Sequence, residues 1–177
     1  IYKKKNPEEP VNLQEFDQIF VGDRITIDKN SSIVISFTDN SLLTLKGESD
    51  FTVKKFNKTS SKPTFILSIP KGKFSFESGS IAKHNEGIMK INLSGMEVKL
   101  SGTLAVGANT GGTKTVTLIE DSMGNLGTLE VGLQGSDEIK VLTESAAGVS
   151  ASFSEEEQEA IDTGDTAAIS ATASALE

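Results

Sequence analysis

The segment MEVKLSGTLAVG (residues 96–107) contains two runs of alternating apolar and polar residues, separated by a Ser-Gly-Thr break. Met96, Val98 and Leu100 alternate with charged residues, which is typical of a strand with one face on a core and the other in water. Glycine readily adopts a positive φ, so Gly102 favours a bulge or a corner at which the chain changes sheet, with Thr103 bonding back to the backbone. The alternative is a close backbone approach that admits a ligand or a partner.

The same alternation recurs along most of the chain. It is clear in RITID (24–28), SSIVISF (31–37), FTVKKF (51–56), TFILSI (64–69) and KFSF (73–76), and again within residues 89–93, 116–118 and 129–133. The runs are separated by turn-like breaks at TDNS (38–41), LKGES (45–49), IPKG (69–72), LSGM (93–96) and EDSMGN (120–125). Strands at this spacing predict an all-β domain, either a two-sheet sandwich or a short β-solenoid-like domain. No helical periodicity is visible between residues 21 and 143.

The composition changes near residue 144, which suggests three parts: an N-terminal segment (1–20), a β domain (21–143) and an Ala/Ser/Glu-rich helical tail or linker (144–177). Ser154 followed by Glu157 forms a capping-box pattern and predicts a small C-terminal helix. The Ala-rich residues 166–177 are expected to form a second short helix or a low-complexity linker.

Composition also limits the partners of the chain. Its 177 residues carry a formal net charge of −8 with a pI near 4.8, which argues against nucleic acids and anionic membrane surfaces. No apolar stretch is long enough to span a bilayer, so membrane attachment is expected only through flanking segments beyond this sequence. There are no cysteines, which excludes disulfides and thiolate metal sites.

Signals for catalysis are negative. The single histidine, His84, lies in a polar, turn-like stretch and no recognisable nucleophile motif accompanies it. GANTGGTKT (107–115) lacks the Gly-Lys-Ser/Thr step of a phosphate-binding loop and precedes a strand, so a glycine-rich hairpin is the better interpretation. We expect no enzyme activity, no catalytic or cofactor-binding residues, no cofactor and no metal site.

Taken in order, the turns and strands of VGDRITIDKNSSIVISFTDNSLLTL (21–45) resemble the first half of a FecR-type domain. In that family a Gly-Asp step, an Asp-Gly-Ser turn, a glycine before an aromatic strand and an Arg-Gly-Thr step follow one another. Here Asn40 and Ser101 stand where glycine and arginine are usual. The resemblance covers roughly residues 20–143, and its motif residues, interpreted as structural, are Gly22, Asp23, Asp39, Ser41, Gly72, Gly102 and Thr103.

The resemblance implies a function. FecR-like regulators combine a cytoplasmic anti-sigma segment, a membrane helix and a periplasmic β domain, of which only the β domain is recognisable here. We therefore expect a non-catalytic protein-interaction or sensing module of a bacterial envelope protein, in the periplasm or on the cell surface. Its protein partner would bind by strand addition. The alternatives are a structural spacer of a large surface protein and a small-molecule or glycan-binding module. The oligomeric state is left open.

Overall fold

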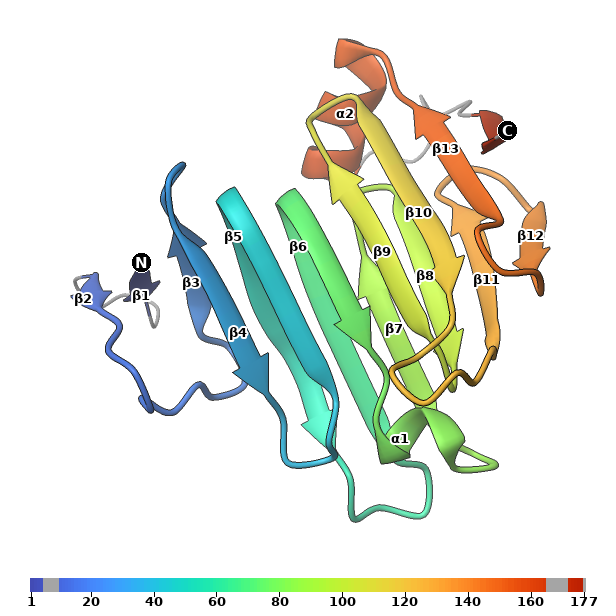
Figure 1. Cartoon of the computed structure of the whole chain (residues 1–177). Helices are drawn as coiled ribbons and strands as arrows, with labels where there is room; N and C mark the ends of the chain where they lie inside the picture. The colour runs from blue at the N-terminus through green and yellow to red at the C-terminus, as the bar shows by residue number, and fades with distance from the viewer. Residues whose placement is uncertain (5–9, 165–171, 177) are drawn as a thin grey trace.

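Two layers of β-strands face each other, and all strands belong to one hydrogen-bonded network of 14 strands. The structure is a computed structural model that describes residues 1–4, 10–164 and 172–176. The front layer of Figure 1 consists of β4 (Ser32–Ser36), the first half of β5 (Leu42–Asn57), the second half of β6 (Thr64–Glu77), β9 (Leu104–Asn109), β10 (Thr113–Ile119), β13 (Gly148–Ser152) and β14 (Thr172–Leu176).

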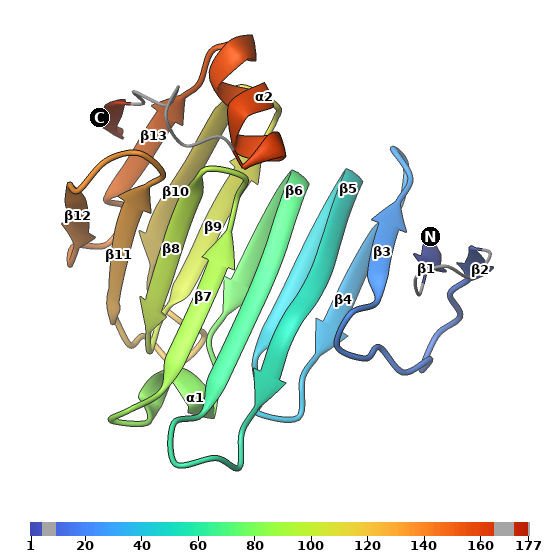
Figure 2. The same cartoon turned by 180° about the vertical axis from the view of Figure 1, so that it is seen from behind.

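The back layer is seen from its outer side in Figure 2. It consists of β2 (Val11–Asn12), β1 (Tyr2–Lys4), β3 (Arg24–Ile27), the second half of β5, the first half of β6, β7 (Ile88–Asn92), β8 (Met96–Ser101), β11 (Thr128–Leu133) and β12 (Ile139–Leu142). Neighbouring strands are antiparallel except β6 and β7, which run parallel. The core lies between the layers, and buried positions alternate along strands such as β8, β10 and β11. The prediction of an all-β domain is confirmed.

The long strands β5 and β6 belong to both layers. Residues 42–46 of β5 pair with β4 and with residues 73–77 of β6, whereas residues 49–52 of β5 pair with β3. The register between β5 and β6 shifts between Lys46 and Thr52. The breaks predicted at 45–49 and 69–72 are therefore not turns between separate strands, but creases within two continuous strands.

Gly72 makes the crease of β6 possible. Its φ is +125°, and a Cβ added there would lie 2.2 Å from Ser49 Oγ and 2.9 Å from Ser49 Cα. Both the positive φ and this close approach require glycine. The two strands can thus touch where they bend from one layer into the other.

Two helices lie at opposite ends of the layers (Figure 1). The single turn α1 (Ser80–Lys83) was not expected from the sequence. The helix α2 (Glu155–Thr163) begins with the predicted capping box, in which the Ser154 hydroxyl accepts from the Glu157 N–H and the Ser154 N–H donates to Glu157. The small helical C-terminal segment is confirmed. In the described part of the chain, no helix has the length and apolar character needed to cross a bilayer.

The C-terminal residues also contribute strands. β13 pairs with β10 in the front layer, although it lies in the segment that the sequence assigns to the tail. Of the Ala-rich residues 166–177, those at 166–171 and 177 lie outside the described residues. The expectation of a helix or linker is wrong for Thr172–Leu176, which pair with β13 as β14, because the exposed edge of β13 supplies backbone partners that local composition does not reveal.

Candidate docking groove

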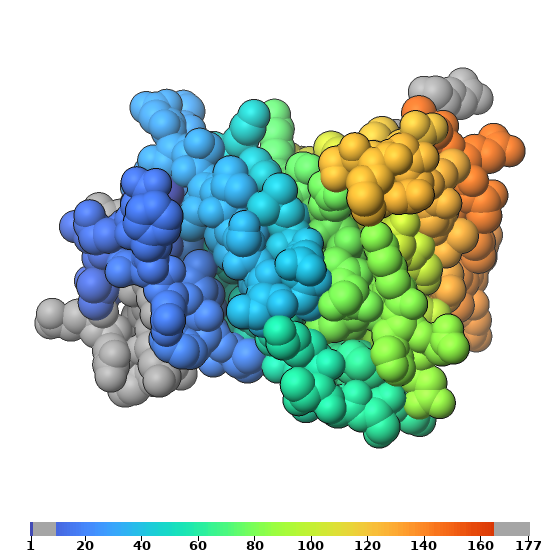
Figure 3. Space-filling view, turned by 60° about the horizontal axis from the view of Figure 1, so that its bottom comes forward, coloured from blue at the N-terminus to red at the C-terminus, as the bar shows by residue number. Residues whose placement is uncertain are grey.

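A groove of about 1030 Å³ lies beside β4, where the N-terminal residues 13–21 approach it. One wall is β4, and the other is the segment 13–21. Ile1 and the β5 residues Val53 and Phe56 complete the lining. Figure 3 shows the N-terminal residues in dark blue beside the lighter blue of the β3–β4 region. The groove thus follows the lateral edge of the front layer, where the sheet does not close on itself.

The outer edge of β4 has free backbone groups. Phe37 N–H donates to Ser41 O and Gly47 N–H donates to Ser31 O, so residues 31, 33, 35 and 37 face β5 in the alternating antiparallel pattern. The N–H and C=O groups of Ser32, Val34 and Ser36 therefore point away from β5. Among the described strands, none pairs with this side of β4. An extended segment could add to the sheet here.

Apolar side chains line the groove toward the core. Ile35 is buried, and Ile33 and Phe37 are partly buried against the core. The Phe37 ring lies 4.6 Å from the Phe65 ring and 6.1 Å from the Phe56 ring, measured between centroids. An added strand would place alternate side chains on this apolar floor.

The far wall presents exposed aromatic rings. Phe16 is 93% exposed and has a φ of 69°, and Phe20 is more than half exposed. A positive φ is uncommon for a residue with a bulky side chain. The groove therefore combines free strand-edge groups on one side with uncovered apolar surface on the other, as expected for a peptide-binding site.

A second free edge lies at β12, on the opposite side of the molecule (Figure 1). Gln134 N–H donates to Gly95 O, so the even-numbered residues of β11 face β8 and the odd-numbered ones face β12. The backbone groups of Ile139 and Val141 consequently point outward, and both side chains are exposed.

Residues 23–123 match the family described as FecR protein. The chain belongs to the FecR family. The match confirms the resemblance that the sequence suggested, and membership supports a regulatory rather than a catalytic role. None of the curated proteins compared with the chain matches it.

Two crystal structures of a candidate anti-sigma factor from Parabacteroides distasonis share the fold of this FecR chain. The TM-scores are 0.59 and 0.58, at 10% and 8% sequence identity. In each comparison 85% of this chain is covered, but it spans only 58% of the solved chain.

The FecR motif residues lie at three separate places, none of which lines the groove. Asp39, Ser41 and Thr103 gather at the end of the molecule that carries α1. Gly72 lies at the crease. Gly22 and Asp23 precede β3, where the Asp23 carboxylate accepts from the Phe20 N–H at 2.8 Å and the Gly22 N–H donates to Val53 O at 2.9 Å. The motif residues thus lie apart from the groove.

Buried hydrogen bonds join the motif residues at the α1 end. Ser41 Oγ donates to Asp39 Oδ2 at 2.8 Å and accepts from the Gly79 N–H at 2.9 Å. Asp39 and Ser41 are both almost fully buried. A Cβ at position 79 would lie 2.2 Å from Asp39 O, so the β4–β5 turn and the loop before α1 fit closely. The side-chain oxygens of Asp39 and Ser41 thus all have hydrogen-bond partners, as buried polar groups in folded proteins generally do.

The Gly102–Thr103 step is the corner between the layers. Gly102 has a φ of 68°, and the chain passes there from β8 in the back layer to β9 in the front layer. Thr103 Oγ1 donates to Ile119 O at 2.9 Å, and the Thr103 N–H donates to Ser78 Oγ at 2.7 Å. Both contacts connect this corner to neighbouring segments of the chain.

Lys114 was missed by the sequence reasoning. It is fully buried on β10, and its Nζ donates to Gly111 O at 2.5 Å and to Gln158 Oε1 of α2, and lies 4.6 Å from the centroid of the Phe153 ring. Burial lowers the pKa of Lys114, and the nearby Asp162 carboxylate opposes this effect. The alternation itself contained the signal, because Lys114 precedes the inward-facing Val116 by two residues. The confirmed glycine-rich hairpin thus carries a residue that fixes α2.

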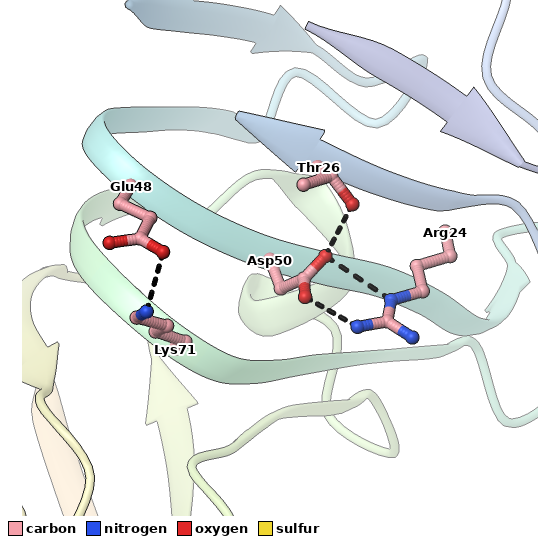
Figure 4. A network of polar contacts seen from close by, with 5 residues as sticks. All are labelled: Arg24, Thr26, Glu48, Asp50 and Lys71. Atoms are coloured by element: carbon pink, nitrogen blue, oxygen red, sulfur yellow. Dashed lines mark hydrogen bonds and ion pairs between the residues drawn. The ribbon is translucent and has the colours of Figure 1, made fainter. Parts of the chain in front are cut away.

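Charged side chains also form a surface network at the outer face of the sheet. On the outer face near the crease, Asp50 accepts from Arg24 at 2.5 Å and from Thr26 at 2.7 Å, and Lys71 contacts Glu48 at 2.7 Å (Figure 4). The hydrogen bond to Asp50 raises the pKa of Arg24.

His84 is exposed after α1. Across residues 1–4, 10–164 and 172–176, no three His, Asp or Glu side chains are grouped as metal ligands would be.

Proposed function

We propose that this FecR domain is a non-catalytic protein-interaction or sensing module of a bacterial envelope protein. It acts in the periplasm or at the cell surface, and it binds an extended segment of a partner protein through the outer edge of β4. The observation that carries the proposal is the row of free backbone groups at Ser32, Val34 and Ser36 beside an apolar groove. Family membership supports a regulatory role of this kind.

Strand addition uses both features of the site. Backbone hydrogen bonds to β4 give affinity that does not depend on partner sequence, and alternate side chains of the partner enter the groove and give specificity. Contact with Ile33, Ile35 and Phe37 would extend the core of the domain across its open side.

The test is Val34→Pro, with Val141→Pro as the matched control. Both valines are exposed residues on edge strands, and both N–H groups point outward. Proline at either position removes one outward donor and no hydrogen bond within the sheet, so both variants should fold. Circular dichroism and thermal unfolding check this.

A photo-cross-linking residue at the exposed position of Phe16, in the wall of the groove, captures only what occupies the β4 edge. The proteins that it captures from an envelope extract are then compared for the three forms. We expect Val34→Pro to lose at least ten-fold of a partner that wild type and Val141→Pro retain. If a folded Val34→Pro recovers the same proteins in the same amounts as wild type, the β4 edge is not the binding site.

A further inference from the structure

We infer that the segment that adds to β4 is β12 of a second copy of this chain, so that copies join head to tail. This inference rests on the proposed function, since it names the occupant of the same edge. The two edges lie on opposite sides of the molecule, so each copy can use both at once (Figure 1).

The backbone groups of the two edges are complementary. Ser32, Val34 and Ser36 face outward from β4, and Ile139 and Val141 face outward from β12. In an antiparallel pairing that places Val34 opposite Val141, Ser36 lies opposite Ile139. Each of these pairs joins residues whose N–H and C=O groups both point to the partner, as a hydrogen-bonded pair requires.

The side chains on both faces of such a ladder also match. Val34, Ile139 and Val141 are 62%, 61% and 59% exposed, and they would lie together on the outer face. Cross-strand pairs of β-branched residues stabilise a sheet. On the inner face Leu142 would lie opposite Ile33, and both are already partly buried against the core of their own copy. Lys140 would add its aliphatic stem to the groove.

The exposed lysines at the two ends of β4 are opposite in sign to the carboxylates beside β12, while Glu15 and Asp17 place negative charge on the far wall of the groove. Lys29 precedes β4, Lys46 is directly opposite Ser32 on β5, and Lys73 is opposite Lys46 on β6. All three are exposed, and in the described part of the chain they form no ion pair. Lys58 lies at the other end of β4, where its Nζ donates to Thr38 O at 2.9 Å.

The β12 edge carries carboxylates at matching places. Asp137 and Glu138 precede the strand and Glu144 follows it, and all three are exposed. With Val34 opposite Val141, residue 144 falls opposite residue 31, near Lys29 and Lys46, and residue 137 falls opposite Thr38, near Lys58. A chain with a net charge of −8 would otherwise repel its copies, so this local complementarity favours one register and one orientation.

Because the two contacting surfaces differ, the contact is heterologous. Two copies joined in this way still have one unoccupied β4 edge and one unoccupied β12 edge, to which further copies can add. The same arrangement provides the test, since each proline variant removes one edge and leaves the other. Val34→Pro retains the β12 edge, and Val141→Pro retains the β4 edge. Neither should associate alone, but their equimolar mixture should form a dimer that cannot grow.

Sedimentation velocity over a range of concentrations measures this for residues 1–177. Wild type should show species larger than 18.8 kDa that increase with concentration and diminish in high salt. Each proline variant should remain at 18.8 kDa, and the mixture should show a two-fold higher mass. A monomeric wild type, or variants that associate as wild type does, would overturn the inference.

The two proposals fail in different ways. If wild type is monomeric while Val34→Pro still loses an envelope partner, the β4 edge binds a different protein and only the self-association falls. If folded Val34→Pro both associates with itself and keeps every partner, the β4 edge is not used at all and both proposals fall.

Discussion

Lys114 is a charged residue at a core position. Its ammonium donates only to neutral acceptors, the Gly111 carbonyl and the Gln158 side-chain oxygen, and lies near the Phe153 ring. Removing a lysine from water costs free energy that such contacts offset only in part. The contact with Gln158 therefore positions α2 on the sheet, while burial disfavours the charged form of the Lys114 side chain in the folded state.

We predict a specific pH dependence from this residue. Because burial lowers the folded-state pKa of Lys114, the unfolded chain binds more protons between the folded and unfolded pKa values, and stability should rise with pH in that range. Lys114→Met should remove this rise and should be within about 1 kcal/mol of wild type, or more stable, near pH 7. Urea unfolding from pH 7 to 11 measures the difference between the two.

Lys73→Met provides the matched control, because it removes a lysine from an exposed position of the sheet and should not change the burial of Lys114. A Lys114→Met protein that is much less stable at pH 7 would show that the contacts to Gly111, Gln158 and Phe153 exceed the cost of burial.

At the scale of elements, the sequence predicts which face of a strand is buried better than it predicts how successive strands are connected. Alternation identified the buried sides of β8 and β11, and the Ser154–Glu157 spacing identified the start of α2. Alternation did not show whether the chain turns or continues as a creased strand at Gly47 and Gly72. Glycine permits both conformations, and only the pairing of β5 with β6 shows that the strands continue. The sequence also did not predict the groove, because the groove depends on where residues 13–21 lie in three dimensions.

The crease leads to a second prediction. Gly72→Ala should destabilise the domain by about 2 kcal/mol or more, because it adds an overlap with Ser49 to the strain of a positive φ. Gly111→Ala is the matched control: its φ is +81° and a Cβ there meets nothing within 4 Å, so it carries the backbone strain alone. Chemical denaturation of both variants measures the difference. Equal losses would show that contact at the crease contributes nothing.

At the scale of the whole molecule, the two layers are not separate units. β5 and β6 each pair with strands of both layers, and the buried side chains of the layers form one core. If β5 or β6 unfolds, both layers therefore lose a central strand. This arrangement favours one cooperative unfolding transition over stepwise loss of the layers.

The third prediction follows from this shared pair of strands. Native-state hydrogen exchange in low urea should give the same opening free energy for β9 in the front layer and β8 in the back layer, and Gly72→Ala should lower both by the same amount. Exchange suits this chain because it has no tryptophan to report on either layer. The helix α2, fixed by few buried side chains, should open at lower free energy and respond little to Gly72→Ala. A variant that weakened β9 and left β8 protected would show that the crease acts as a hinge between two independent sheets.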